Sequence, residues 1–303
     1  MNRVLCVGHA VEDYLFRVAS LPRTPEKHLA ESFEVVGGGP AANAAVAISR
    51  LGGEALLAAR LGDDPAGASI VAALEADCVN CALVRRFGEA RSSVSSVYID
   101  DAGRRQIVNF LDPAMPDAAD WLLNDWPSDI DTVLVDVRWP GGAEAALARA
   151  RKMGAPGVLD ADHPIPPDGG LIALASHAAF SAEGLRGFTG EHDLETGLRR
   201  IAREVDAWCC VTDGADGVLL AEKDGCVRIP APAVKAVDTL GAGDIWHGAF
   251  ALRIAEGAAE REAVEFANAA AAVKVTRPGG RRGAPSRAET VSLLDKKPME
   301  ATA

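Results

Sequence analysis

Short apolar runs alternate along the chain with segments whose apolar residues recur at helical spacing. The first run, Val4 to Val7, ends at Gly8 and is typical of a buried strand followed by a loop. Residues 41–53, AANAAVAISRLGG, then predict a small-residue helix that stops at Gly52. The alternation continues beyond residue 130 with strand-like runs such as TVLVDV and AWCCVTDG. Apolar strands alternating with helices indicate an α/β fold whose mostly parallel sheet is covered on both faces.

Two segments interrupt this alternation. Residues 12–36 and 91–112 contain β-favouring runs in which polar and apolar residues mix, such as SSVSSVYIDD and RRQIVNFLD. The DDAG sequence between those two runs predicts a hairpin turn. We expect a small one-sided sheet, made of two separate pieces, that forms a lid over an active site; ordinary surface hairpins are the alternative. The expected division is a core of residues 1–11, 37–90 and 113–295, a β lid of residues 12–36 and 91–112, and a flexible tail of residues 296–303.

The overall charge excludes one class of partner. The 303 residues carry a net charge of −12 and are 49% hydrophobic, which suits a globular protein with a large core. A net charge of this sign repels polyanions, so nucleic acid is not an expected partner. Neither a signal peptide nor an apolar span of about 20 residues is found in the sequence. We therefore expect a cytoplasmic protein that does not bind a membrane.

Residues 237–250, VDTLGAGDIWHGAF, place an acid in a small-residue turn at the start of an apolar helix. Such a turn presents unpaired backbone N–H groups, and the helix dipole adds partial positive charge. Gly241 and Gly243 let the backbone approach a ligand, so the turn predicts an anion hole for phosphoryl oxygens. Asp244 can accept a proton from an attacking hydroxyl as general base. An acid that only stabilises the helix N-terminus is the alternative.

This stretch resembles the C-terminal signature of the ribokinase-like (PfkB) carbohydrate kinases. Residues 35–53, VVGGGPAANAAVAISRLGG, resemble their N-terminal signature, and the similarity covers nearly the whole chain. It implies a ribokinase-like three-layer sandwich with a mostly parallel central sheet and a small discontinuous β lid. It also implies ATP-dependent phosphorylation of a sugar hydroxyl. By the resemblance, Asp244 is the base, and Gly241, Ala242 and Gly243 form the anion hole.

Other positions match the family one at a time. The acid of GHAVED matches the residue that holds sugar hydroxyls, and the first signature contributes hinge glycines and a sugar-contacting amide. The VTDGADG sequence matches the nucleotide loop, and the helix FANAAAAVKV carries an amide expected in the adenine pocket. A plain tight turn and a helix-start role are the alternatives for the glycines and the amide of the first signature. The positions so assigned are Asp13, Gly38, Gly39 and Asn43 for the sugar, and Thr212, Gly214, Gly217 and Asn268 for ATP.

One family motif is not intact. Family members carry N-x-x-E before the nucleotide loop, where it organises Mg²⁺-bound water. Aligning FSAEGLRGFTG on its final Thr-Gly puts Ser181 at the Asn position and Gly184 at the Glu position, with Glu183 as the candidate to substitute through water. Mg²⁺ is still expected, because the triphosphate charge must be neutralised. The tract Arg277 to Gly283 resembles the loop that helps to surround a monovalent cation such as K⁺; an exposed basic loop is the alternative.

The segments GGGPAA, DVRW, HAAFS and TRPGGRRGAP resemble the branch of the family that phosphorylates 6-deoxy-6-sulfofructose. A sulfonate carries a fixed charge and three acceptor oxygens, so it requires charged donors and an amide. Lys27, Asn109 and Arg138 match that branch, and we expect them to converge on the distal end of a ketose held by Asp13. The expected product is the 1-phosphate. A sugar phosphate would suit the same groups, and a solvated lysine, a turn cap and a structural ion pair are the alternatives.

Other functions stay open at this stage. A kinase of a neutral sugar or nucleoside would share the fold but would not need Lys27 and Arg138 to face the substrate. A sugar-binding regulator without catalysis is opposed by the intact GAGD and favoured by the altered N-x-x-E. A dinucleotide oxidoreductase is opposed because no G-x-G-x-x-G follows the first strand. Exposed lid strands pair across dimers in the family, so a homodimer through the lid is expected.

Overall fold

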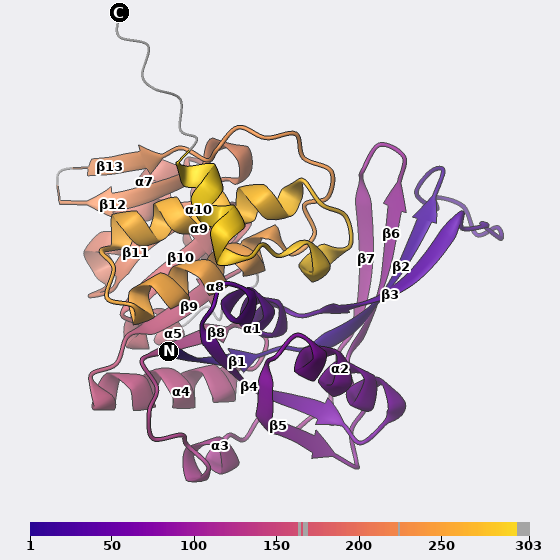
Figure 1. Ribbon diagram of the computed structural model, residues 1–303, viewed down its shortest axis with the longest axis horizontal. Helices are drawn as coiled ribbons and strands as arrows, with labels where there is room; N and C mark the ends of the chain where they lie inside the picture. The colour runs from indigo at the N-terminus through magenta and orange to yellow at the C-terminus, as the bar shows by residue number, and fades with distance from the viewer. Residues whose placement is uncertain (163–164, 166–168, 224, 296–303) are drawn as a thin grey trace, which may run out of the picture.

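The computed structural model describes residues 1–162, 165, 169–223 and 225–295. They form a three-layer α/β sandwich, from one end of which a second, smaller sheet projects (Figure 1). The predicted α/β class, the mostly parallel central sheet and the separate small sheet are confirmed. The expected tail, residues 296–303, lies outside the described residues.

Nine strands form the large sheet. In chain order they are β1 (Arg3–Gly8), β4 (Glu54–Gly62), β5 (Asn80–Phe87), β8 (Thr132–Asp136), β9 (Gly157–Ala161), β10 (His177–Ser181), β11 (Trp208–Thr212), β12 (Val218–Glu222) and β13 (Gly225–Ile229). Their spatial order is β13-β12-β11-β10-β9-β8-β1-β4-β5. All neighbouring pairs from β11 to β5 are parallel, and β12 runs antiparallel to both of its neighbours, β11 and β13. The parallel strands therefore end at one common edge.

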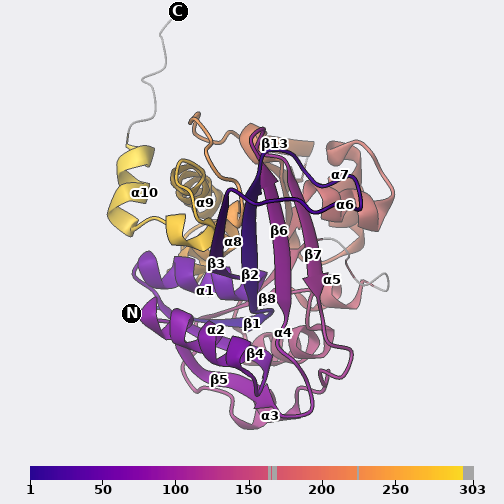
Figure 2. The same ribbon diagram turned by 90° about the vertical axis from the view of Figure 1, so that its right-hand side faces the viewer.

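Helices cover both faces of this sheet, as Figure 2 shows from the side. One layer contains α1 (Pro40–Arg50), α2 (Pro65–Ala76), α8 (Ala242–Ala255) and α9 (Glu260–Val275), with α10 (Arg287–Leu294) packed on α9. The other contains α3 (Asp120–Asn124), α4 (Pro140–Met153), α5 (Gly170–Leu174), α6 (Ala182–Thr189) and α7 (Leu194–Glu204). Each layer encloses its own apolar cluster against the sheet. Strands buried on both faces explain the continuous apolar runs of the sequence.

The small sheet, called the lid below, is built from both interrupting segments. It contains β2 (Val11–Val18), β3 (Ser32–Gly38), β6 (Val94–Asp100) and β7 (Arg105–Phe110), in the order β3-β2-β6-β7. The predicted hairpin turn joins β6 to β7, and Asp100 Oδ1 accepts hydrogen bonds from the backbone N–H groups of Ala102 and Arg104. The inner face packs Leu15, Val36, Val97 and Ile99 against Leu240, and the outer face carries contacting aromatic rings of Tyr14, Phe16, Phe33 and Tyr98.

Helices α1 and α8 approach so closely that one contact requires a glycine. A Cβ built on Gly248 would lie 2.5 Å from the carbonyl oxygen of Ala44 and 3.0 Å from its Cα. The requirement here is space rather than backbone conformation. Because residue 248 lies one helical turn after Asp244, and Ala44 follows Asn43, this contact sets the distance between those two side chains.

The Gly248→Ala variant tests this packing. Alanine normally stabilises a helix relative to glycine by about 1 kcal/mol, but here its methyl group must push the two helices apart, at a cost of about 1–3 kcal/mol. We expect lower stability in urea unfolding. Gly88→Ala, whose Cβ would meet nothing within 4 Å, is the control and should stay within about 0.5 kcal/mol of wild type. Equal or greater stability of Gly248→Ala would show that the contact can relax freely.

Candidate active site

The predicted site residues gather where the parallel strands end. Arg138 follows β8, Asp162 follows β9, Thr212 ends β11, and the loop after β1 leads into β2 and Asp13. Ligands of open parallel sheets bind in the crevice outside the carboxyl ends of the strands. The lid stands over this edge of the sandwich (Figure 1).

The small-residue turn begins α8 as the sequence predicts. Gly241 is the N-cap, with a positive φ of 75° that favours glycine, and the helix starts at Ala242. Gly243 is exposed, and a Cβ built there meets nothing within 4 Å. The turn is therefore open on the side of Gly243, as an anion site requires, although the Ala242 N–H already donates to the carbonyl oxygen of Thr239 at 3.2 Å.

A buried ion pair anchors this turn from behind. Asp238 accepts hydrogen bonds from the backbone N–H groups of Leu240 (2.8 Å) and Gly280 (2.9 Å). The fully buried Lys274 donates from Nζ to the carbonyl of Asp238 at 2.7 Å. Although burial raises the pKa of Asp238, these N–H groups and Lys274 hold it below its ordinary value. Asp238 and Lys274 were not predicted, and the acid three residues before the GAG turn was the available signal.

Asp244 is poised to accept a proton. Its Oδ2 accepts a hydrogen bond from Asn43 Nδ2 at 2.6 Å. Burial raises its pKa to about 6, the bond from Asn43 lowers it, and the nearby Asp162, Asp136 and Asp13 raise it. A base whose pKa lies just below neutral is suited to proton transfer. Asn43 Oδ1 is buried and has no partner among the described residues, so it can accept a bond from a ligand hydroxyl.

Asp13 is buried on the inner face of the lid, against the first glycine-rich signature. A Cβ on Gly38 would lie 2.1 Å from Asp13 Oδ2, so only glycine leaves room for this carboxylate. Burial raises the pKa of Asp13, while a bond from Ser95 and the charge of Arg281 lower it. Ser95 in turn accepts a hydrogen bond from Asn109 Nδ2 at 2.8 Å. The structure therefore places Asp13 and Asn109 in one line across the lid, with Ser95 between them.

Asp136, at the end of β8, ties three segments together. Its Oδ2 accepts the backbone N–H groups of His9 (2.7 Å) and Ala41 (3.0 Å), and its Oδ1 accepts that of Arg138 (2.8 Å). Gly39, between these segments, has φ 94° and would bring a Cβ within 2.4 Å of the carbonyl oxygen of His9. The role of Asp136 was missed, although an acid at the end of the buried run TVLVDV was its signal.

Lys27, Asn109 and Arg138 do not all converge within one chain. Arg138 Nη2 lies 3.6 Å from Asp162 Oδ2, so an ion pair is present. Lys27 lies in the exposed connection 19–31 at the outer end of β2 and β3 (Figure 1). From Asp13 to the end of β2 at Val18 the strand alone spans about 17 Å. The expectation that one chain brings all three residues together is therefore not met.

A buried histidine and carboxylate lie beneath the turn. His247 Nδ1 is 2.8 Å from the carbonyl oxygen of Gly243, and its Nε2 is 3.2 Å from that of Ala179 and 3.4 Å from Asp160 Oδ1. Burial raises the pKa of Asp160 well above its ordinary value, the charge of Asp244 raises it further, and burial lowers the pKa of His247. Burial therefore favours the neutral form of both groups. The sequence did not reveal this pair.

The predicted nucleotide residues line a cavity of about 550 Å³. Thr212, Gly214, Gly217 and Asn268 all face it, and Gly243 of the small-residue turn stands at its edge. Its remaining walls are largely alanine, valine, proline and tryptophan side chains. An apolar cavity that ends at an anion-binding turn has the shape and polarity that a nucleotide requires.

Asn268 holds the cavity wall rather than presenting its amide to a ligand. Its Oδ1 accepts a hydrogen bond from Trp246 Nε1 at 2.8 Å, and its Nδ2 donates to the carbonyl of Ile229 at 3.2 Å. Gly217, with φ 88°, lies opposite the same carbonyl, where a Cβ would approach within 2.1 Å. Asn268 is therefore in the predicted place, with its polar atoms bound to protein.

The altered N-x-x-E motif has a steric cause. A Cβ on Gly184 would lie 2.2 Å from the carbonyl oxygen of Ala161, so the position cannot carry a glutamate in this backbone. Ser181 caps α6 by accepting the N–H of Gly184 and donates to Asp162 Oδ1 at 2.8 Å. Glu183 lies in the first turn of α6. Asp162, which the sequence reasoning missed, is thus a carboxylate close to the base.

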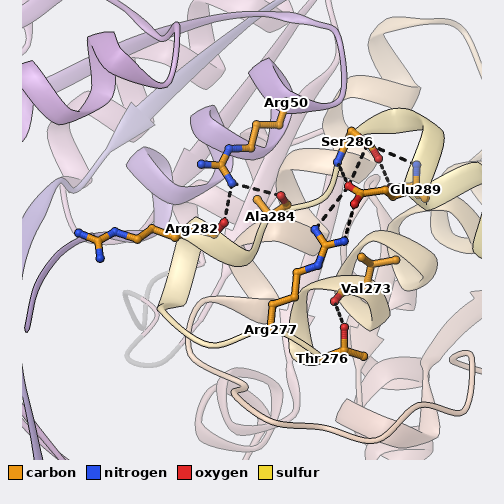
Figure 3. A network of polar contacts seen from close by, with 9 residues as sticks. Arg50, Val273, Thr276, Arg277, Arg282, Ala284, Ser286 and Glu289 are labelled. Carbon is orange, nitrogen blue, oxygen red and sulfur yellow. Dashed lines mark hydrogen bonds and ion pairs between the residues drawn. The ribbon is translucent and has the colours of Figure 1, made fainter.

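The basic tract is structured: in Figure 3 its Arg277 side chain bonds to Glu289, and the carbonyl of its Arg282 bonds to Arg50. Residues Gly280–Gly283 form the short 3₁₀ helix η2. Arg50 Nη1 donates to the carbonyls of Arg282 (2.7 Å) and Ala284 (3.2 Å), and Arg282 Nη2 donates to the carbonyl of Val35 on β3. A Cβ on Gly37 would lie 2.0 Å from Arg281 Cζ, so the buried arginine fills the space that the glycine leaves. A monovalent cation here stays a prediction.

The chain resembles known sugar kinases along almost its whole length. The sequence profile of the pfkB family carbohydrate kinase matches residues 1–287. Identity is 27% over 307 residues to the ribokinase of Bacillus subtilis (strain 168), covering 97% of this chain and 100% of that one. It is 26% over 318 residues to the fructokinase of Vibrio alginolyticus, covering 97% and 99%.

Solved structures agree with these matches. A crystal structure from Agrobacterium tumefaciens, assigned to the ribokinases, is 38% identical with a TM-score of 0.90, covering 97% of this chain and 98% of that one. Arabidopsis thaliana ribokinase, solved with ribose and ATP, is 25% identical with a TM-score of 0.84, covering 98% and 99%.

Fold, turn and relatives together define an ATP-dependent carbohydrate kinase. The chain belongs to the pfkB family of carbohydrate kinases. The regulator and oxidoreductase alternatives are thereby excluded. Among the described residues, no helix is both long and apolar enough to cross a membrane.

The raised pKa of Asp244 predicts a pH dependence. A general base must be unprotonated, so kcat/KM should rise as pH increases through about 6. Asn43→Ala removes the bond that lowers this pKa, so the midpoint should move to higher pH. Rate profiles between about pH 5 and pH 8 measure this. Asn80→Ala, at an exposed amide on β5, should keep the wild-type midpoint. A rate that falls through this range, or an Asn43→Ala midpoint that stays in place, contradicts the assignment.

Proposed function

We propose that this kinase transfers the γ-phosphoryl group of ATP to the 1-hydroxyl of 6-deoxy-6-sulfofructose. The observation that carries the proposal is that the site combines hydrogen-bond acceptors with donors. Asp13, Asn43 and Asp244 offer acceptors for sugar hydroxyls, whereas Asn109 and Arg138 offer donors. A ketose with an anionic far end would match both sets.

The chemistry follows from groups around the small-residue turn. Asp244 accepts the proton of the attacking hydroxyl while Asn43 fixes the orientation of its carboxylate. The N–H groups at Gly241, Ala242 and Gly243 stabilise the charge that spreads over the phosphoryl oxygens. Burial favours the protonated form of Asp160, which limits the negative charge beneath the turn, where a second free carboxylate would repel the phosphates.

Mg²⁺ is part of the proposal. When bound to ATP, it neutralises triphosphate charge. Asp162 offers a half-exposed carboxylate that is oriented by Ser181 and lies close enough to Asp244 to raise its pKa. Carboxylate oxygens reached through water suit this ion. Asp162, with Glu183 beside it on α6, would hold the metal-bound water in place of the missing motif.

A homodimer through the lid is proposed as the cytoplasmic form. The outer face of the lid exposes Phe33 (53%), Val108 (61%) and Phe110 (41%), an apolar surface typical of an interface. We propose that pairing of two lids brings the connection carrying Lys27 to the site of the second copy. Lys27 would then join Asn109 and Arg138 at the sulfonate from outside the chain that holds the sugar.

A second candidate is a kinase of a neutral sugar. The ion pair between Arg138 and Asp162 favours it, because this arginine has an acidic partner without a substrate sulfonate. The names of the relatives, ribokinase and fructokinase, are also those of kinases of uncharged sugars. Ribose and fructose are therefore the necessary comparison substrates.

Asp244→Asn tests the base. The amide keeps the shape of the side chain but cannot take a proton, so turnover should fall by about 10²–10⁴ with little change in ATP affinity. ATP consumption and nucleotide binding measure the two effects separately. Asp206→Asn, at an exposed acid, should keep full turnover. Undiminished turnover of Asp244→Asn would remove the aspartate from the mechanism.

Substrate selectivity tests the anionic end. If Arg138 and its neighbours hold a sulfonate, fructose and ribose lack the anionic group that these donors recognise and should be poorer substrates, by up to about 10⁴ in kcat/KM. Arg138→Ala should raise the KM for sulfofructose and leave that for ATP unchanged; Arg261→Ala, at the surface, is the control. Fructose 6-phosphate, tagatose 6-phosphate and adenosine complete the panel. A wild-type preference for a neutral sugar would retain the kinase and reject the sulfonate.

A further inference from the structure

One arginine of the lid reaches the nucleotide cavity. Arg105, the first residue of β7, lines the same cavity of about 550 Å³ as Thr212, Gly214 and Gly243. It lies far along the chain from the nucleotide loop and from the turn. The lid hairpin therefore extends over the nucleotide as well as over the sugar.

The geometry of β7 separates these two ends. Side chains alternate along a strand, so Arg105 and Asn109 point from the same face of the lid. Asn109 is joined through Ser95 to Asp13 at the sugar end. Four residues of strand separate the two positions by about 13 Å. Arg105 is thus displaced from the sugar toward the cavity that ends at Gly243.

The described residues that line the cavity are otherwise uncharged, so the charge of Arg105 is important for an anionic ligand. Among the described residues that line the cavity, it is the one charged side chain. Lys274 lies near enough for Arg105 to lower its pKa, but its side chain is fully buried and bound to Asp238. A triphosphate in this cavity would meet a single side-chain cation, on a protein whose net charge is −12.

We propose that Arg105 binds the β- and γ-phosphates of ATP and so fastens the lid over the nucleotide, a role that rests on the nucleotide site proposed above. A guanidinium donates two parallel N–H bonds to phosphate oxygens, which a lysine cannot do. The turn that precedes Arg105 is fixed by Asp100, which holds the backbone and side chain of Arg104. The arginine is therefore carried on a rigid hairpin. Because β7 also carries Asn109, sugar and ATP binding become coupled through one strand.

Nucleotide titrations of the full chain test this role. Isothermal calorimetry with ATP, ADP and AMP, each with Mg²⁺, compares wild type with Arg105→Ala. Loss of the guanidinium should weaken ATP binding about tenfold, weaken ADP less, and leave AMP unchanged. Arg105→Lys should recover part of the ATP affinity, because it restores the charge without the planar pair of donors. The coupling also predicts that sugar raises ATP affinity in wild type, and that this increase is smaller in Arg105→Ala.

Two control variants make the result decisive. Arg17→Ala removes an exposed arginine from the same face of the lid and should bind all three nucleotides as wild type does. Unchanged ATP affinity in Arg105→Ala, an equal loss for AMP, or an effect on sugar KM alone would each overturn the proposal. Ala271→Trp fills the apolar part of the cavity and should abolish binding of every nucleotide. If ATP still binds to Ala271→Trp, the nucleotide site itself is misplaced, whatever Arg105 does.

Discussion

The hydrogen bond between Asn43 and Asp244 depends on how closely α1 and α8 can pack. The Ala44 carbonyl lies where a methyl group on residue 248 would be, so only glycine allows this approach. One helical turn away, the side chains of Asn43 and Asp244 meet. The start of α1 is fixed in turn by Asp136, which binds the N–H of Ala41. A contact between small residues thus brings the amide of Asn43 to the carboxylate of Asp244.

The site concentrates carboxylates, and their different hydrogen-bond partners separate their roles. Burial raises the pKa of each, but Asp136 receives three backbone N–H bonds, and Asp13 receives one from Ser95. Asp160 lies 3.4 Å from His247 Nε2. Asp244 receives one amide bond, so it retains a pKa of about 6 and the ability to take up a proton. Asp13 and Asp244 thus receive one side-chain donor each, and what sets Asp244 apart is its place in the first turn of α8.

The local sequence predicted the layers, the lid hairpin and the turn at Gly241, because hydrophobic periodicity and glycine spacing depend only on residues that are close along the chain. Three features depend on contacts that join distant segments. Gly184 excludes a glutamate only because the Ala161 carbonyl lies against it. The Asp160–His247 pair joins two strands and a helix, and Lys27 lies in a connection without periodicity whose direction no motif fixes. Contacts between distant segments, and the direction of a loop, cannot be recognised in a single sequence.

The contacts between the lid and η2 determine whether the lid could be exchanged for that of another protein. Gly37 of β3 accommodates Arg281, and Arg282 binds the carbonyl of Val35, so the lid rests on a segment more than 240 residues away. The lid is therefore not an interchangeable module. A chimera that imported the lid of another family member would place a foreign strand on Arg281, and a side chain at position 37 would displace that arginine. The lid strands and the η2 arginines that hold them would therefore have to be exchanged together, in engineering or in evolution.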